Sequence, residues 1–201
     1  MPRPPKPRRR TASRSPKANP ASFTRLDLDS ALLHASPALR RAFELSHEAL
    51  ERRGIPHVIV GGLAVNAYGH HYSTKDVDYL VDATDAFDGS LVLTHKPGVP
   101  FEVGGVQIDY VTARPDYPDV VLRAMADVVA AARARPDVVM VVPDWLLVWM
   151  KLNAGRSKDV AGIEGLIKAG LDVESVRVAL ARAGDERVAR FFERCVMNAE
   201  E

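Results

Sequence analysis

The chain has 201 residues, 47% of them hydrophobic, and a formal net charge of +1. The length predicts one globular domain with a sizeable core, and the near-balanced charge argues against binding of nucleic acid by the whole fold through charge alone. The single cysteine, Cys195, excludes an internal disulfide framework and a zinc site built from cysteines, and no run approaches the ~18 apolar residues that span a bilayer, so we expect a cytoplasmic protein without a membrane partner.

Residues 1–22 form a basic segment that differs from the rest of the chain. They contain seven basic residues, no acid and six of the 14 prolines. Because this segment has almost no large apolar side chains to bury, we expect it to be disordered, and no apolar stretch follows its basic run as in a secretory signal. It is interpreted either as an arm that contacts RNA or DNA phosphates or as a solvated leader.

Helix and strand signals alternate through the first part of the remaining chain. Ser36 and Pro37 form a helix start signal, and apolar residues then recur at helical spacing up to Gly54. An apolar run, a Gly-Gly turn and an alternating apolar-polar run then predict a strand at 57–60, a helix at 63–68 and a strand at 76–82.

The second half begins with strand signals and ends in helices. Gly104 and Gly105 separate two runs rich in β-forming residues, 101–103 and 106–112, which predicts a hairpin. The remaining predicted elements are a helix at 120–133, a strand at 138–142, and four helices at 143–154, 158–169, 173–183 and 185–198.

The order of these elements predicts an α/β protein of the α+β kind. Residues 23–142 would form a small mixed β-sheet core flanked by helices. Residues 143–201 would follow as a C-terminal helical bundle that completes a site on the core.

Residues 58–82 carry the most informative pattern in the chain. A predicted strand runs into Gly61-Gly62, a short helix follows, and the next predicted strand starts with Asp76 and Asp78. Glycines allow backbone N–H groups to approach a phosphate closely. Two carboxylates two residues apart on a strand project from the same face and repel each other unless a cation joins them, and such oxygen ligands suit Mg²⁺.

Two further charged residues lie among apolar neighbours. Asp109 sits between Ile108 and Tyr110 on a predicted strand, where an unpaired acid is costly and a bound metal would remove the cost. Lys151 lies on a predicted helix rich in Trp, Leu, Val and Met, where a lysine could bind an anionic group as a point charge. The alternatives are ordinary polar-face acids for the aspartates and, for Lys151, a side chain whose stem lies along apolar surface.

The Gly-Gly and Asp-x-Asp pattern resembles the nucleotidyltransferase superfamily with the polymerase-beta-like fold. GGLA at 61–64 together with TKDVD at 74–78 looks like the AbiEii-type branch, the minimal nucleotidyltransferases of bacterial toxin–antitoxin systems. The resemblance continues in KLNA at 151–154, Arg156, Lys158 and Asp159, which are similar to a later segment of that branch.

The resemblance implies a role for each candidate residue. Asp76, Asp78 and Asp109 would bind Mg²⁺, in a two-metal arrangement where two ions are held, and would be catalytic together with Lys151. Asp159 would orient Lys151 or activate the acceptor hydroxyl. The residues implied in nucleotide binding are Gly61, Gly62, Thr74, Lys151, Arg156, Lys158 and Asp159.

The function that the resemblance implies is transfer of NMP from an NTP such as ATP to a hydroxyl on RNA, for instance tRNA, or on a protein. A cognate antitoxin or toxin would be a partner. One alternative is an antibiotic-modifying nucleotidyltransferase of the lincosamide or aminoglycoside type. Another is a degenerate, non-catalytic member that binds a partner protein, because Tyr72 stands where the branch has an arginine and Gly162 where it has an aspartate.

Overall fold

A computed structural model of the protein describes residues 24–25, 31–88 and 94–201. The segment 1–22, expected to be disordered, lies outside these residues. Among the helices of the described ranges, none combines the length and the apolar character needed to cross a bilayer.

A six-stranded mixed sheet forms the centre of the fold. In spatial order its strands are β1 (Thr24–Arg25), β8 (Met140–Val141), β2 (His57–Ile59), β3 (Val77–Val81), β7 (Val106–Val111) and β6 (Glu102–Val103). Strand β3 runs antiparallel to β2 and parallel to β7. A separate two-stranded sheet pairs β4 (Phe87–Asp88) with β5 (Thr94–His95).

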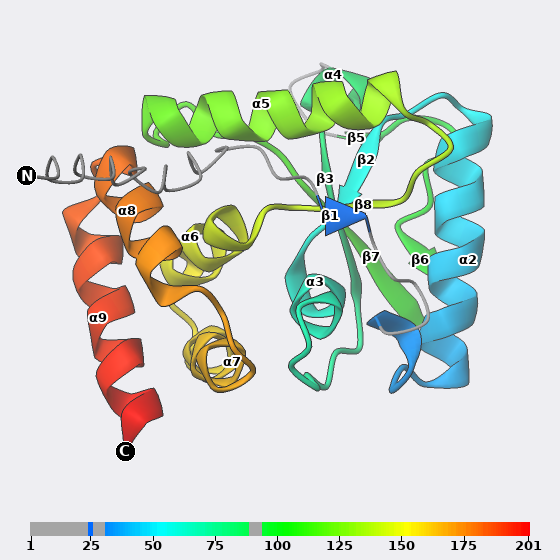
Figure 1. The fold of residues 1–201 in the computed structure, drawn as a ribbon. Helices are drawn as coiled ribbons and strands as arrows, with labels where there is room; N and C mark the ends of the chain where they lie inside the picture. The colour runs from blue at the N-terminus through cyan, green and yellow to red at the C-terminus, as the bar shows by residue number, and fades with distance from the viewer. Residues whose placement is uncertain (1–23, 26–30, 89–93) are drawn as a thin grey trace, which may run out of the picture.

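Helices border the sheet and form a second group beside it. In chain order they are α2 (Pro37–Arg52), α3 (Gly61–Ala67), α4 (Ala83–Ala86), α5 (Asp119–Ala134), α6 (Asp144–Ala154), α7 (Ser157–Lys168), α8 (Val173–Ala183) and α9 (Glu186–Glu200). Helices α2 and α5 pack on the sheet, whereas α6 to α9 lie together on the side away from α2 (Figure 1). The expected fold class is confirmed.

Local signals in the sequence explain where several elements begin and turn. The Ser36 hydroxyl accepts a hydrogen bond from the Leu39 N–H at 3.1 Å, and Pro37 opens α2. Gly104 and Gly105 have φ of +58° and +81° between β6 and β7. Two consecutive positive φ angles are what a tight type I′ hairpin needs, so the predicted hairpin is confirmed.

The core joins the sheet to the C-terminal helices. Its largest side chains, each less than 2% exposed, include Tyr79 of β3, Trp149 of α6 and Phe192 of α9. The single thiol, Cys195, is 1% exposed and packs in this core. Helices α6 to α9 therefore share their hydrophobic interior with the sheet.

The strand predicted at 76–82 is shorter and more buried than its alternating pattern suggests. Strand β3 begins at Val77, so Asp76 lies just before it. All three of its last residues, 79–81, are buried. The reason is that β3 lies in the middle of the sheet between β2 and β7 and is contacted by α2, α3 and α5, so both of its faces are covered.

Two other predicted boundaries are wrong. The helix expected from residue 63 begins at Gly61, because Gly61 adopts a positive φ of +62° that lets the chain turn from β2 directly into the helix. The strand expected at 138–142 is only Met140–Val141. Its length is limited by its neighbours, since it pairs with two residues of β1 and one of β2.

Candidate active site

Three aspartates meet at the start of β3. Asp78 and Asp109 are register partners on the parallel strands β3 and β7, and Asp76 immediately precedes β3. One carboxylate oxygen of each lies within 4.8 Å of the other two. Within the described ranges, no other group of three or more His, Cys, Asp or Glu side chains lies close enough to hold one metal ion. The structure thus brings the predicted aspartates together.

The neighbouring residues of the same strands turn the opposite way and fix the direction of the acids. Tyr79 and Tyr110 are also register partners, and their stacked rings lie 6.1 Å apart. The Tyr79 hydroxyl is hydrogen-bonded to the Ser46 hydroxyl of α2 at 2.8 Å. Because side chains alternate along a strand, anchoring Tyr79 beneath α2 directs Asp78 away from it.

Burial and the two neighbouring carboxylates act together on Asp78. Burial, then the charges of Asp76 and Asp109, raise the pKa of Asp78 to about 6, although the charge of Lys151 and a hydrogen bond from the Gly62 N–H act in the opposite direction. A divalent cation would relieve this repulsion. The oxygen-only ligand set fits Mg²⁺, which prefers carboxylates and completes its shell with water and substrate phosphates.

The two glycines at the start of α3 make room for other side chains of the site. Gly61 has φ of +62°, and a Cβ there would lie 1.8 Å from Oδ2 of Asp78. A Cβ on Gly62 would lie 2.4 Å from the Cβ of Thr74. Any larger residue would displace Asp78 or Thr74. Since the Gly62 N–H also lowers the pKa of Asp78 and so interacts with this carboxylate, phosphate binding by these glycines stays a prediction.

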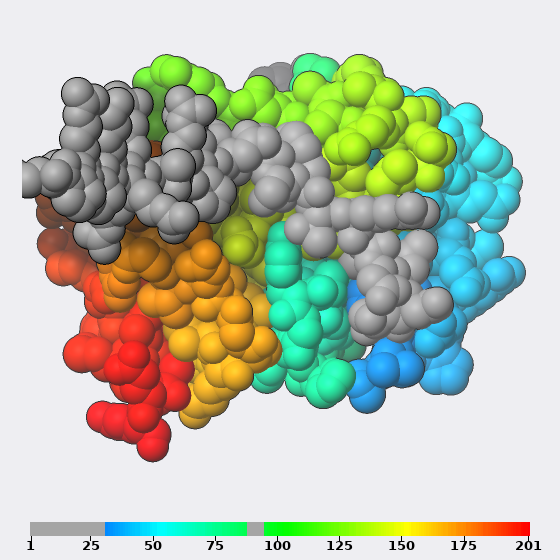
Figure 2. Space-filling view, viewed as in Figure 1, coloured from blue at the N-terminus to red at the C-terminus, as the bar shows by residue number. Residues whose placement is uncertain are grey.

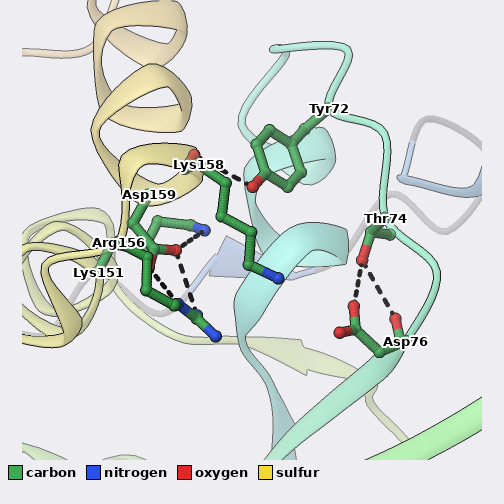
Figure 3. A network of polar contacts seen from close by, with 7 residues as sticks. All are labelled: Tyr72, Thr74, Asp76, Lys151, Arg156, Lys158 and Asp159. Carbon is green, nitrogen blue, oxygen red and sulfur yellow. Dashed lines mark hydrogen bonds and ion pairs between the residues drawn. The ribbon is translucent and has the colours of Figure 1, made fainter.

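Thr74 orients the first aspartate. Its hydroxyl donates to Oδ1 of Asp76 at 2.6 Å and also lies 3.3 Å from the Asp76 carbonyl oxygen (Figure 3). The short bond to a carboxylate oxygen is of the charge-assisted kind. Thr74 therefore fixes the rotamer of a residue that no regular strand geometry holds.

A cluster of positive charges faces the site from α6 and α7. The cations surround one buried acid, Asp159, which is 1% exposed. Oδ1 of Asp159 lies 3.2 Å from Nζ of Lys151, and Oδ2 lies 2.6 Å from Nε of Arg156 (Figure 3). Burial alone would raise the pKa of Asp159, but the hydrogen bonds and charges of Arg156 and Lys151 lower it below its usual value. Two cations share one carboxylate, so one positive charge remains unbalanced.

Lys151 is only 6% exposed. The alternative interpretation, in which its stem lies along apolar surface, accounts for the burial of the stem but not for the ion pair of its ammonium with Asp159. Its ammonium also lies 4.8 Å from the ring centroid of Tyr72. The contact with Asp159 was expected, whereas the contact with Tyr72 was not, because Tyr72 was noted only as a departure from the branch's pattern.

A cavity of about 690 Å³ joins the acidic and basic clusters. It is lined by every predicted site residue: Gly61, Gly62, Thr74, Asp76, Asp78, Asp109, Lys151, Arg156, Lys158 and Asp159. On the face shown in Figure 2, the teal surface of the α3 region lies directly beside the yellow and orange surface of the C-terminal helices. The cavity therefore belongs to the junction between the sheet core and those helices.

Sequence reasoning missed one wall of this cavity. Arg114 and Tyr117, in the connection between β7 and α5, line it together with Met150 and Asn153 of α6. The Arg114 guanidinium lies 5.7 Å from the Tyr117 ring centroid. No local motif marks this wall, because its residues come from two separate segments that only the fold brings together.

No protein family, no curated protein and no solved structure matches this chain in the comparisons with known proteins. The assignment of a function therefore depends on the residues of the cavity and on the sequence pattern.

Proposed function

We propose that the protein is an Mg²⁺-dependent nucleotidyltransferase. The observation that carries the proposal is the division of one cavity into an acidic cluster of Asp76, Asp78 and Asp109 and a basic cluster around Asp159. A metal–triphosphate complex needs both: carboxylates for the cation and cations for the phosphates. The resemblance of the Gly-Gly and Asp-x-Asp pattern to nucleotidyltransferases supports the same conclusion.

The three aspartates would hold Mg²⁺, because their oxygens converge and their mutual repulsion is relieved by a cation. When bound, the ion would stabilise the charge on the entering and leaving oxygens of a phosphoryl transfer. Lys151, Arg156 and Lys158 would bind the triphosphate from the opposite wall. Thr74 would keep Asp76 in its ligating rotamer.

In the proposed reaction, a carboxylate oxygen of Asp109 accepts the proton of the acceptor hydroxyl. The hydroxyl oxygen forms a bond to the α-phosphorus, the bond from that phosphorus to the bridging oxygen breaks, and pyrophosphate leaves. The acceptor would be an RNA end, such as that of tRNA, or a protein hydroxyl, by resemblance to the toxin–antitoxin branch. A cognate antitoxin or toxin would then be a binding partner.

The two departures from that branch do not argue for a degenerate member. The Tyr72 ring packs against the Cα side of Gly162, where an added Cβ would lie 3.3 Å from Cε2 of the ring. The two substitutions are therefore complementary, and the space is filled. The packing at these two positions is therefore intact, and the binding and transfer measurements below distinguish a catalytic from a partner-binding member.

The first test is a thermal-shift measurement with Mg²⁺ and each of the four NTPs. A nucleotide at 100 times its Kd should stabilise the protein by about 2.7 kcal/mol. We expect a shift that requires Mg²⁺ and disappears in Asp76→Asn/Asp78→Asn. The matched control is Asp127→Asn on the exposed side of α5, which should respond like the wild type.

The second test measures transfer. Labelled NTP is incubated with tRNA, with protein, and with small aminoglycosides and lincosamides, and pyrophosphate release is followed. Transfer to RNA or protein supports the proposal, and transfer confined to the antibiotics supports the antibiotic-modifying alternative. Absence of both NTP binding and pyrophosphate release in the folded protein would contradict nucleotidyl transfer and favour a partner-binding role.

A further inference from the structure

Two rings of the connection between α3 and β3 pack against two glycines of α7. Tyr72 lies over Gly162, and His70 lies over Gly165, where an added Cβ would lie 2.1 Å from Nε2 of the imidazole. Glycines weaken a helix interior by about 1 kcal/mol each relative to alanine. Here the missing side chains allow α7 to approach this connection closely, which explains why glycines stand at these two helical positions.

Tyr72 has contacts to three helices. Its backbone N–H donates to the side-chain oxygen of Asn66 in α3 at 2.6 Å, and its hydroxyl donates to the Lys158 carbonyl oxygen in α7 at 3.1 Å. Its ring lies 4.8 Å from Nζ of Lys151 in α6. Figure 3 shows the ring between the connection that carries it and the helix of Lys158. One residue therefore connects α3 with the C-terminal helices at the wall of the cavity.

These contacts define the surroundings of the Lys151 ammonium. Asp159 binds it on one side at 3.2 Å, and the Tyr72 ring lies near it at a distance typical of cation–π attraction. A Cβ at Gly162 would lie 3.8 Å from the same nitrogen, so the absence of a side chain at this position leaves room for both the ring and the ammonium. The ammonium thus lies between a carboxylate and a ring, and Lys151 lines the cavity.

We propose that Tyr72 is a positioning residue: its ring, seated on Gly162, holds the Lys151 ammonium where it meets the triphosphate. This inference rests on the proposed nucleotidyltransferase function. The ring carries the effect, and the hydroxyl contributes little, because its hydrogen bond to the Lys158 carbonyl is exposed and exchanges easily with water.

The proposal predicts different effects for two substitutions of Tyr72. Tyr72→Phe keeps the ring and its contacts with Lys151 and Gly162, so the Kd for the Mg²⁺–NTP complex should stay within about twofold of the wild type. Tyr72→Leu fills most of the apolar space but lacks the π face, so this Kd should rise about five- to tenfold. Gly162→Ala should raise it about two- to threefold, because the added methyl pushes the ring away from its seat.

The experiment combines calorimetric titration of each variant with Mg²⁺–NTP, steady-state kinetics, and the rate at which acetic anhydride acetylates Lys151, read by mass spectrometry. For Tyr72→Leu we expect KM for the NTP to rise while KM for the acceptor is unchanged, and we expect Lys151 to be acetylated several times faster. Phe101→Leu, which removes an exposed ring outside the cavity, serves as the control and should change none of these values.

Each outcome bears on the proposal. It is overturned if Tyr72→Leu changes only the melting temperature and leaves both the Kd and the Lys151 acetylation rate unaltered, or if Tyr72→Phe is as defective as Tyr72→Leu. Should the wild type bind no Mg²⁺–NTP, the proposed function fails. The acetylation rates then still decide whether the ring holds Lys151, so the two failures are distinguishable.

Discussion

The acidic and basic walls of the cavity are built in different ways. The acids lie on or beside β3 and β7, and the register of two parallel strands places Asp78 opposite Asp109. The basic wall lies at the junction of α6 and α7, where Lys151 and Arg156 are held by their shared bonds to Asp159. Backbone pairing fixes the first wall without help from its charges, whereas ion pairing fixes the second. Substitutions should therefore separate activity from stability on one wall and lower both on the other.

The largest expected effect is on activity at the acidic wall. Asp78→Asn should reduce nucleotidyl transfer at least about a thousandfold, because a metal ligand is lost. Its free energy of unfolding in the absence of Mg²⁺ should be unchanged or higher, since a repelling charge is removed. Pyrophosphate-release kinetics and urea unfolding measure the two quantities. A variant that is both inactive and strongly destabilised would contradict the independence of this wall from its charges.

At the basic wall, in contrast, removing a carboxylate should lower the stability of the fold. Asp159→Asn leaves the buried Lys151 without its carboxylate, and should lower the free energy of unfolding by about 3 kcal/mol. Adding Lys151→Met should restore most of that loss, because it removes the unpaired charge. Asp116→Asn, which affects only the exposed ion pair with Arg114, is the control and should change stability by less than about 0.5 kcal/mol. Equal losses in the single and double variants would refute the pairing argument.

The raised pKa of Asp78 predicts that the stability of the fold depends on pH through the acidic wall. The folded pKa of Asp78, about 6, lies above its ordinary value of 3.8, so the folded state binds this proton more tightly than the unfolded state does. Asp78 therefore favours folding at low pH, and its contribution is lost as the pH rises from about 4 to about 6. The loss should be about 3 kcal/mol, because each unit of pKa difference corresponds to about 1.4 kcal/mol.

This dependence is measured as the difference between the wild type and Asp78→Asn in urea unfolding at a series of pH values. The difference should shrink when Mg²⁺ is present, because the ion compensates the ionised carboxylate. A difference that is flat between pH 4 and 6 would show that Asp78 is not strained by its neighbours.

The smallest expected effect concerns Asp76, which of the three clustered aspartates is the one that lies outside a strand. Thr74→Val should weaken Mg²⁺ binding about fivefold, equivalent to about 1 kcal/mol, because Asp76 loses the bond that fixes its rotamer. Thr74→Ser retains the hydroxyl and should bind Mg²⁺ like the wild type. Isothermal titration with Mg²⁺ measures both variants, and equal affinity in Thr74→Val and Thr74→Ser would show that Asp76 needs no such support.

Most of the elements could be predicted from the sequence, because long helices and the Gly104-Gly105 hairpin carry strong local signals. The short strands β1, β4 and β5, each of two residues, could not, since two residues show no periodicity. The burial of the last three residues of β3 was also missed. It depends on which elements cover the strand, and a local alternation pattern does not contain that information.

In the candidate site too, some features could be predicted from the sequence and others depend on the fold. Spacing alone placed Asp76 near Asp78, and every residue proposed from the pattern lines the cavity. The sequence could suggest that Asp109 joins Asp78, but their pairing depends on the parallel register of β3 and β7, which spacing along the chain does not contain. The wall formed by Arg114 and Tyr117, and the seat of Tyr72 on Gly162, come from tertiary packing between segments distant in sequence.

The connection between α3 and β3 joins the C-terminal helices to the acidic cluster. Tyr72 is hydrogen-bonded to α7 and Thr74 to Asp76, and two residues of chain span at most about 7 Å. A displacement of the C-terminal helices would therefore move Asp76, the first of the three proposed metal ligands. Any partner that levers α7 outward would loosen Asp76 without touching the cavity.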